Sequence, residues 1–84
     1  MENTRKKLIY RSWHRGTKEM DLIMGTFADQ NIPHMTVDEL TAYEELLVEN
    51  DPDLYNWISG REAVPKRLNN PILDKLIGFQ ITQK

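Results

Sequence analysis

The sequence contains no cysteine, which excludes disulfide bonds, thiolate metal ligands and a thiol nucleophile. Long apolar segments are also missing: no uninterrupted apolar run exceeds three residues, whereas a helix that spans a bilayer needs about twenty. We therefore expect no direct insertion into a membrane. A chain of 84 residues is too short to divide into several hydrophobic cores, so residues 1–84 are expected to form a single helical domain.

Lys and Arg are absent from residues 21–60, which carry nine Asp and Glu. Residues 1–20 carry six Lys and Arg against two acidic residues, and residues 61–84 carry five against two. Two interpretations remain open: the segregation steers a charged partner, or it holds both basic ends against the acidic middle. It disfavours nucleic-acid binding, because a phosphate tract requires a continuous basic surface.

Apolar residues recur at helical spacing almost throughout the chain, and no alternating strand pattern competes with it. We predict an all-α fold, a small five-helix bundle. The first three expected helices cover about residues 4–14, a segment from the Thr17 cap to 29–33, and a segment from the Thr36–Glu39 capping box to about 50. In the fourth, which runs to about 58, Asp51 is the expected N-cap and Pro52 the first helical residue. Asn70 and Pro71 repeat this signal at the start of the fifth. Gly16 and Gly60 are the expected helix stops.

The same spacing assigns inward faces to the helices. The third helix should bury one side, formed by Val37, Leu40, Tyr43 and Leu47, and the fifth should extend its apolar face to Ile81. The second and third helices are joined by about six residues, so we expect them to pack antiparallel.

Groups able to perform catalysis are scarce. Ser12 lies two residues from His14, so on a helix the two side chains point to different faces and form no nucleophile–base pair. A metal site built from His14, His34 and a carboxylate lacks any ligand spacing typical of metal binding. The scattered glycines form no phosphate loop, and the acidic run lacks the order of a calcium loop. We therefore predict no catalytic, metal-binding or cofactor-binding residue.

One polar segment stands apart, Arg15-Gly16-Thr17-Lys18-Glu19, with Arg11, His14 and Asp21 close by. Gly16 allows the chain to reverse sharply between two helices. The first interpretation is a capped helix corner with a surface Arg15–Glu19 ion pair that contributes at most ~1 kcal/mol. The second is a rigid knob that presents Arg15 and Glu19 outward to grip another protein. The residues alone favour the first.

The segment Arg15-Gly16-Thr17-Lys18-Glu19-Met20-Asp21 resembles the R-G-x-x-E motif of the succinate dehydrogenase FAD assembly factors, also called flavinylation factors. The similarity continues through the third helix and into Asp51-Pro52-Asp53-Leu54-Tyr55-Asn56-Trp57, and it covers most of residues 4–80. His14 departs from the family, where a basic residue commonly precedes the arginine.

The resemblance implies a five-helix protein that is not an enzyme, and we expect the chain to be monomeric. It would bind the flavoprotein subunit of succinate dehydrogenase, with that of fumarate reductase as a further candidate, and promote covalent attachment of FAD to a histidine of that subunit. FAD would belong to the partner, and this chain would bind no cofactor. The family's motif residues correspond to Arg15, Gly16 and Glu19. The neighbouring Arg11, His14 and Asp21 complete the expected partner-binding set.

Other classes of function remain as alternatives. The basic first helix is compatible with a small antitoxin or a regulator that binds nucleic acid or protein, although no recognition helix rich in Arg, Asn and Gln follows it. A minor enzyme would rely on a His14/Glu19 acid–base pair. The absence of a recognisable targeting segment favours a bacterial cytoplasm over a mitochondrial matrix.

Overall fold

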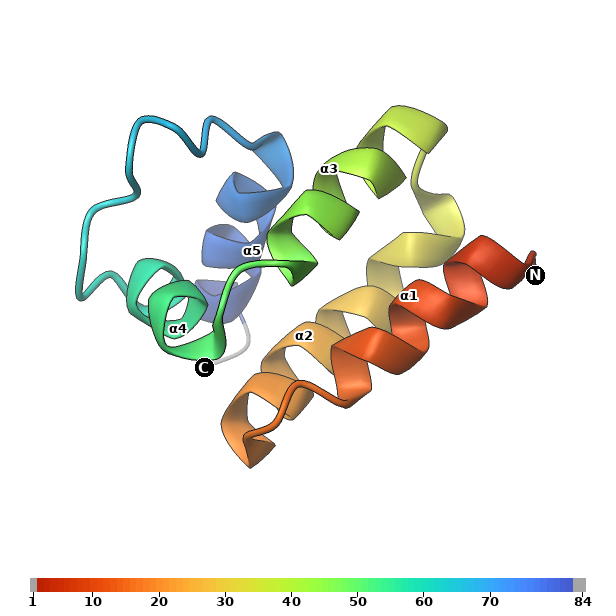
Figure 1. Ribbon diagram of the computed structural model, residues 1–84, viewed down its shortest axis with the longest axis horizontal. Helices are drawn as coiled ribbons and strands as arrows, with labels where there is room; N and C mark the ends of the chain where they lie inside the picture. The colour runs from red at the N-terminus through yellow and green to blue at the C-terminus, as the bar shows by residue number, and fades with distance from the viewer. Residues whose placement is uncertain (1, 83–84) are drawn as a thin grey trace.

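The computed structural model describes residues 2–82, with side chains described through residue 79. It is all-α within this range, which confirms the predicted five-helix bundle (Figure 1). The elements are α1 (Asn3–Trp13), α2 (Lys18–Asn31), the short 3-10 helix η1 (Ile32–His34), α3 (Val37–Leu47), α4 (Asp51–Ser59) and α5 (Pro71–Thr82). The inward position predicted for Ile81 lies outside the described side chains.

The helices form two packed groups that share α3. α1 lies along α2 on one side of the molecule, α4 lies against α5 on the other, and α3 contacts both α1 and α5 (Figure 1). The antiparallel course predicted for the second and third helices is observed, since α3 runs back in the direction opposite to α2. Contact between these two helices includes the rings of Phe27 and Tyr43, whose centroids are 5.9 Å apart.

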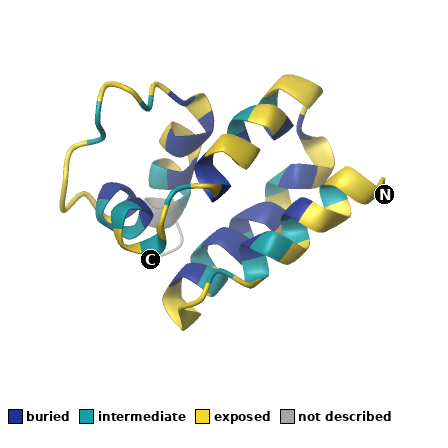
Figure 2. Ribbon diagram, viewed as in Figure 1, coloured by how far each residue is buried: buried dark blue, intermediate teal, exposed yellow. Residues whose placement is uncertain are grey.

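A continuous apolar core joins the two groups (Figure 2). Its fully buried large side chains come from every α-helix and from η1: Leu8, Met20, Met24, Phe27, Ile32, Tyr43, Leu46, Leu54, Ile72, Leu73 and Leu76. The inward position predicted for Val37 is wrong, because its side chain is 75% exposed. Val37 is the first residue of α3, where the helix has only begun, and the core is reached one turn later at Leu40.

The predicted helix-end signals are mostly present. Thr36 and Glu39 form a complete capping box at the start of α3. The N-cap of α4 is Asn50, whose side chain accepts a hydrogen bond from the N–H of Asp53, so the prediction of Asp51 as the cap is wrong by one residue. Asp51 instead forms an ion pair with Arg15, at 2.9 Å. Three other predicted signals are found: the Thr17 cap, the Asn70 cap and the left-handed Gly60.

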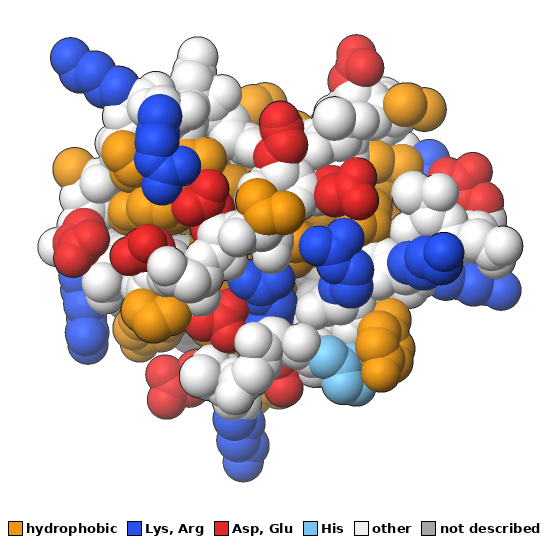
Figure 3. All heavy atoms as spheres, viewed as in Figure 1, with side chains coloured by type: hydrophobic (Ala, Val, Ile, Leu, Met, Phe, Trp, Pro, Cys, Tyr) orange, Lys and Arg blue, Asp and Glu red, His pale blue; other side chains and the backbone are white. Residues whose placement is uncertain are grey.

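Ion pairs connect the basic ends of the chain to its acidic middle. Among the described residues, four pairs do so: Arg11–Glu44, Arg15–Asp51, Arg67–Glu49 and Lys75–Glu39, at 3.5, 2.9, 3.1 and 2.7 Å. Acidic and basic side chains are accordingly interspersed over the face seen in Figure 3. Of the two interpretations of the charge segregation, the structure shows the one in which the ends are held against the middle.

Candidate functional site

The chain reverses direction between α1 and α2 at residues 14–21, hereafter the corner. Gly16 has φ of +119°, a conformation that other residues rarely adopt, so a glycine is needed for this turn. The carboxylate of Asp21 accepts hydrogen bonds from the backbone N–H groups of Arg15 at 2.5 Å and Gly16 at 3.3 Å. The hydroxyl of Thr17 caps α2. One carboxylate and one hydroxyl therefore fix the backbone of the corner.

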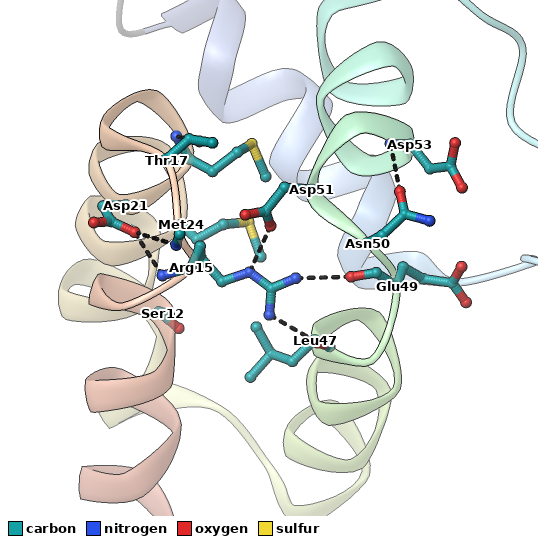
Figure 4. Close-up of polar contacts among 12 residues, drawn as sticks. Ser12, Arg15, Thr17, Asp21, Met24, Leu47, Glu49, Asn50, Asp51 and Asp53 are labelled. Carbon is teal, nitrogen blue, oxygen red and sulfur yellow. Dashed lines mark hydrogen bonds and ion pairs between the residues drawn. The ribbon is translucent and has the colours of Figure 1, made fainter.

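The side chain of Arg15 turns inward and reaches the junction between α3 and α4 (Figure 4). Its Nε–H donates to Asp51 Oδ1 at 2.9 Å, and its two terminal nitrogens donate to the carbonyl oxygens of Leu47 and Glu49, each at 2.7 Å. The side chains of Arg15 and Asp51 are only 10% and 12% exposed. All three guanidinium nitrogens are thus engaged inside the molecule, in what we call the Arg15–Asp51 tie.

The outward orientation of Arg15 and its surface ion pair with Glu19, both expected from the sequence, are wrong. Leu47 is the last residue of α3, and its carbonyl has no partner further along the helix. A guanidinium satisfies several such acceptors at once, and positive charge is favoured at the C-terminal end of a helix. The acceptors lie 32 to 36 residues along the chain from Arg15, so no local sequence pattern reveals them.

Glu19, in contrast, is exposed in the first turn of α2. Among the described residues it has no side-chain hydrogen bond or ion pair. It lines an open hollow of about 240 Å³ between the corner and the start of α4, hereafter the corner hollow. The remaining lining residues are Thr17, Met20, Asp51, Pro52 and Tyr55. The hollow therefore combines apolar walls with an uncompensated carboxylate, which suits a basic side chain next to an apolar surface.

Arg11, in α1, and His14, the residue after α1 ends, do not line the corner hollow. Arg11 is 3.5 Å from the carboxylate of Glu44. His14 donates from Nδ1 to the carbonyl oxygen of Tyr10 at 2.7 Å, and its ring stacks on that of Tyr10 with centroids 4.0 Å apart. Tyr10 itself is 64% exposed. These residues form a polar, aromatic surface beside the corner.

Arg67 also stabilises the turn between α3 and α4 that Arg15 contacts. Arg67 donates two hydrogen bonds to the Glu49 carboxylate, at 3.1 and 3.2 Å. These bonds lower the pKa of Glu49 and raise that of Arg67, so both remain charged at neutral pH. The turn between α3 and α4 is consequently held through the side chain of Glu49 by Arg67 and through its carbonyl by Arg15.

The structure thus divides the predicted partner-binding residues. Arg15, Gly16 and Asp21 form one hydrogen-bonded unit that shapes the corner, and Glu19 alone faces the corner hollow. The sequence did not indicate that Tyr55 would stand across the hollow from Glu19. The available signal was the Asp51–Trp57 segment, which resembles the family's pattern but gives no information about which helix it faces.

Two further properties concern only the part of the chain that the structure describes. Within residues 2–82, no three His, Cys, Asp or Glu residues are grouped so that they could hold a metal ion. No helix in this range combines the length and the apolar character required to cross a membrane.

Comparison with known proteins identifies the family. Residues 6–80 match the protein family described as the flavinator of succinate dehydrogenase, and the chain belongs to this family. The match includes the corner, the α3–α4 junction and the whole of α4. The resemblance seen in the sequence is therefore confirmed.

Individual relatives are both mitochondrial and bacterial. The chain is 42% identical over 73 residues to "Succinate dehydrogenase assembly factor 2, mitochondrial" of Dictyostelium discoideum, covering 87% of this chain and 52% of that protein. It is 38% identical over 73 residues to "FAD assembly factor SdhE" of Acetobacter pasteurianus, covering 87% of this chain and 67% of that one. The protein of the same name from Legionella pneumophila (strain Lens) is 37% identical over 68 residues, covering 81% and 86%.

The chain spans about half the length of the mitochondrial relative from Dictyostelium and most of the length of the Legionella protein. Because relatives occur in both settings, the bacterial compartment expected from the sequence stays a prediction. The names of these relatives do not favour the alternative of an antitoxin or a nucleic-acid regulator.

Proposed function

We propose that this chain is a non-catalytic assembly factor that binds the flavoprotein subunit of succinate dehydrogenase and promotes covalent attachment of FAD to it. The observation that carries the proposal is the family match over residues 6–80, and two bacterial relatives named FAD assembly factors support it. The geometry adds a site for the contact: a rigid corner that exposes Glu19 at the rim of the corner hollow.

In this proposal the groups that form the bond are the flavin and a histidine of the flavoprotein. This chain contributes by holding the flavoprotein in a conformation that aligns the two, and such alignment is a large source of rate acceleration. A preorganised surface is suited to this task, because little additional entropy is lost when it binds. FAD belongs to the partner throughout, and this chain binds none.

The six residues expected to bind the partner take different parts in the proposal. Glu19 pairs with a basic group of the flavoprotein, since its carboxylate is exposed and uncompensated. Gly16 and Asp21 hold the backbone that carries it. Arg11 and His14 contact the partner beside the corner hollow. Arg15 takes part from inside the molecule, through its contacts with the α3–α4 junction.

Replacing Glu19 by Ala tests the proposal. The flavoprotein subunit from the same cell is co-expressed with the wild-type chain, with Glu19→Ala, with Glu45→Ala or with no assembly factor, and covalent flavin is measured by in-gel fluorescence under denaturing conditions. Glu45 is the matched control, because it is exposed on α3, outside the corner hollow, and forms no ion pair with any residue that the structure describes.

We expect Glu19→Ala to lower covalent flavin severalfold while its circular dichroism remains that of the wild type, and Glu45→Ala to have no effect. Equal flavin fluorescence with and without the chain would refute the function itself. Normal flavin with Glu19→Ala, when the chain as such is required, would refute only the contact assigned to Glu19.

A further inference from the structure

The Arg15–Asp51 tie is the polar connection between the corner and the α3–α4 junction. α2 packs mainly on α1 and α4 mainly on α5, so the two walls of the corner hollow belong to different packed groups. One wall contains Glu19 and Met20, and the other contains Pro52 and Tyr55. Arg15 belongs to the first group and its three acceptors to the segment that leads into the second (Figure 4).

Both ends of the tie are fixed. At one end, the backbone N–H of Arg15 is bound by Asp21. At the other, Asp51 is the first residue of α4, and the two carbonyl acceptors lie in the four residues that precede it. A displacement of the guanidinium therefore moves the start of α4 relative to the corner, and with it the distance between Glu19 and Tyr55 across the hollow.

We propose that Arg15 is a positioning residue: together with Asp51 it sets the spacing of the two walls of the corner hollow, and it does not itself grip the flavoprotein. The inference rests on the proposed function, because it concerns the surface through which the flavoprotein is bound. Glu19 and the apolar walls contact the flavoprotein, and Arg15 sets the positions of those walls.

The substitution Asp51→Asn distinguishes a positioning role of Arg15 from direct binding of the flavoprotein, because the two roles predict opposite changes in affinity. Asparagine keeps the shape of aspartate but removes the charge that holds the guanidinium. If Arg15 gripped the flavoprotein, it would first have to leave the tie, so a weaker tie would increase affinity. If Arg15 positions the walls, a weaker tie decreases affinity.

The dissociation constant for the purified flavoprotein subunit is measured by calorimetry for the wild type, Asp51→Asn, Arg15→Lys, Glu19→Ala and the control Glu45→Gln. The temperature is chosen so that circular dichroism shows every variant folded, because a purely structural role would then leave the dissociation constant unchanged. We expect Asp51→Asn and Arg15→Lys each to weaken binding roughly tenfold, and Glu45→Gln to leave it unchanged. Lysine at position 15 should not maintain wild-type affinity, because a single ammonium group cannot reproduce the planar guanidinium that reaches three acceptors.

Double variants supply a second criterion. The effects of Arg15→Lys and Asp51→Asn should be strongly non-additive, because either substitution breaks the same tie. The effects of Glu19→Ala and Arg15→Lys should combine to a greater loss than either alone. Tighter binding by Asp51→Asn, or unchanged affinity of folded Arg15→Lys, would overturn the positioning role.

A measurement on the wild-type chain does not depend on whether variants fold. The Nε–H signal of Arg15 is followed by NMR as the flavoprotein is added. It should keep its chemical shift and its protection from solvent exchange if the tie persists in the complex, and its loss or a large shift would refute the proposal. Failure of the wild-type chain to bind the flavoprotein at all would instead count against the proposed function.

Discussion

At the scale of a single residue, Tyr43 shows how the core accommodates a polar group. Its side chain is fully buried, and its hydroxyl lies 2.5 Å from Ser12 Oγ, which in turn donates to the carbonyl of Leu8 at 2.7 Å. Either hydroxyl can be the donor in the first of these bonds, because the Tyr43 hydroxyl also has the carbonyl oxygen of Met24 as an acceptor at 3.4 Å. Burial raises the pKa of Tyr43 to about 12, although the Ser12 hydrogen bond opposes the shift.

This shift predicts a loss of stability in alkaline solution. Between the unfolded pKa of about 10 and the folded pKa of about 12, the unfolded chain releases the proton that the folded chain retains, so the free energy of unfolding falls as pH rises. The contribution is fully present below about pH 10, and its loss amounts to about 3 kcal/mol by about pH 12. Urea unfolding followed by circular dichroism at several pH values measures it.

Tyr43→Phe provides the comparison. Without the hydroxyl, the variant should lose about 1 kcal/mol near neutral pH and should show a much shallower decline above about pH 10. An equally steep decline in the variant would assign the alkaline loss to other groups, such as the lysines.

At the scale of an element, the close approach of α1 and α2 depends on Gly25. A Cβ at this position would overlap the indole ring of Trp13, which lies against α2. The Trp13 Nε1–H also donates to Asp29 at 3.3 Å, one turn further along α2. The ring therefore packs directly against the backbone of α2 at residue 25, where there is no room for a side chain.

Gly25→Ala should consequently destabilise the protein by about 1–3 kcal/mol, because either the ring or the helix must shift. Gly78→Ala is the matched control: Gly78 also lies in a helix, and a Cβ there would meet nothing within 4 Å. That variant should gain about 0.5–1 kcal/mol, because alanine is the better helix former. Chemical denaturation of both variants measures the difference, and equal stabilities would contradict the assigned role of Trp13.

At the scale of the whole molecule, the charge pattern of the sequence acts within the fold. Its acidic middle is held by ion pairs from both basic ends. Hydrogen bonds from Lys75 and Arg67 lower the pKa values of Glu39 and Glu49, respectively. Both side chains are partly exposed, Glu39 to 31% and Glu49 to 17%, so their contributions are screened in part by salt.

These lowered pKa values predict a sensitivity to acid. A carboxyl whose pKa is lower in the folded state contributes stability that is present above its unfolded pKa and is lost as pH falls through the folded pKa. The melting temperature should therefore decrease from about pH 6 to about pH 3, and less steeply at high salt. Glu39→Gln combined with Glu49→Gln should flatten this profile, whereas Glu45→Gln should leave it unchanged. An identical profile in the double variant would show that the ion pairs contribute nothing.

Much of the fold was predictable because helix formation is a local property. Five helices, the Thr36–Glu39 capping box and the stop at Gly60 follow from residues close together in the sequence, and all are observed. The errors at Arg15 and Asp51 arose where a distant contact competed with a local signal. Asp51 has the chemistry of an N-cap, but Asn50 caps α4 and Asp51 pairs with Arg15 instead.

The candidate site likewise has features that local sequence specifies and features that depend on distant contacts. The sequence by itself determined the corner, because a glycine with a capping threonine and acidic residues in the next turn specify a tight reversal between two helices. Only the tertiary structure decided that Arg15 points inward while Glu19 remains outside. The orientation of a long side chain depends on where unsatisfied acceptors lie in space, and those acceptors are brought to Arg15 by helices from another part of the chain.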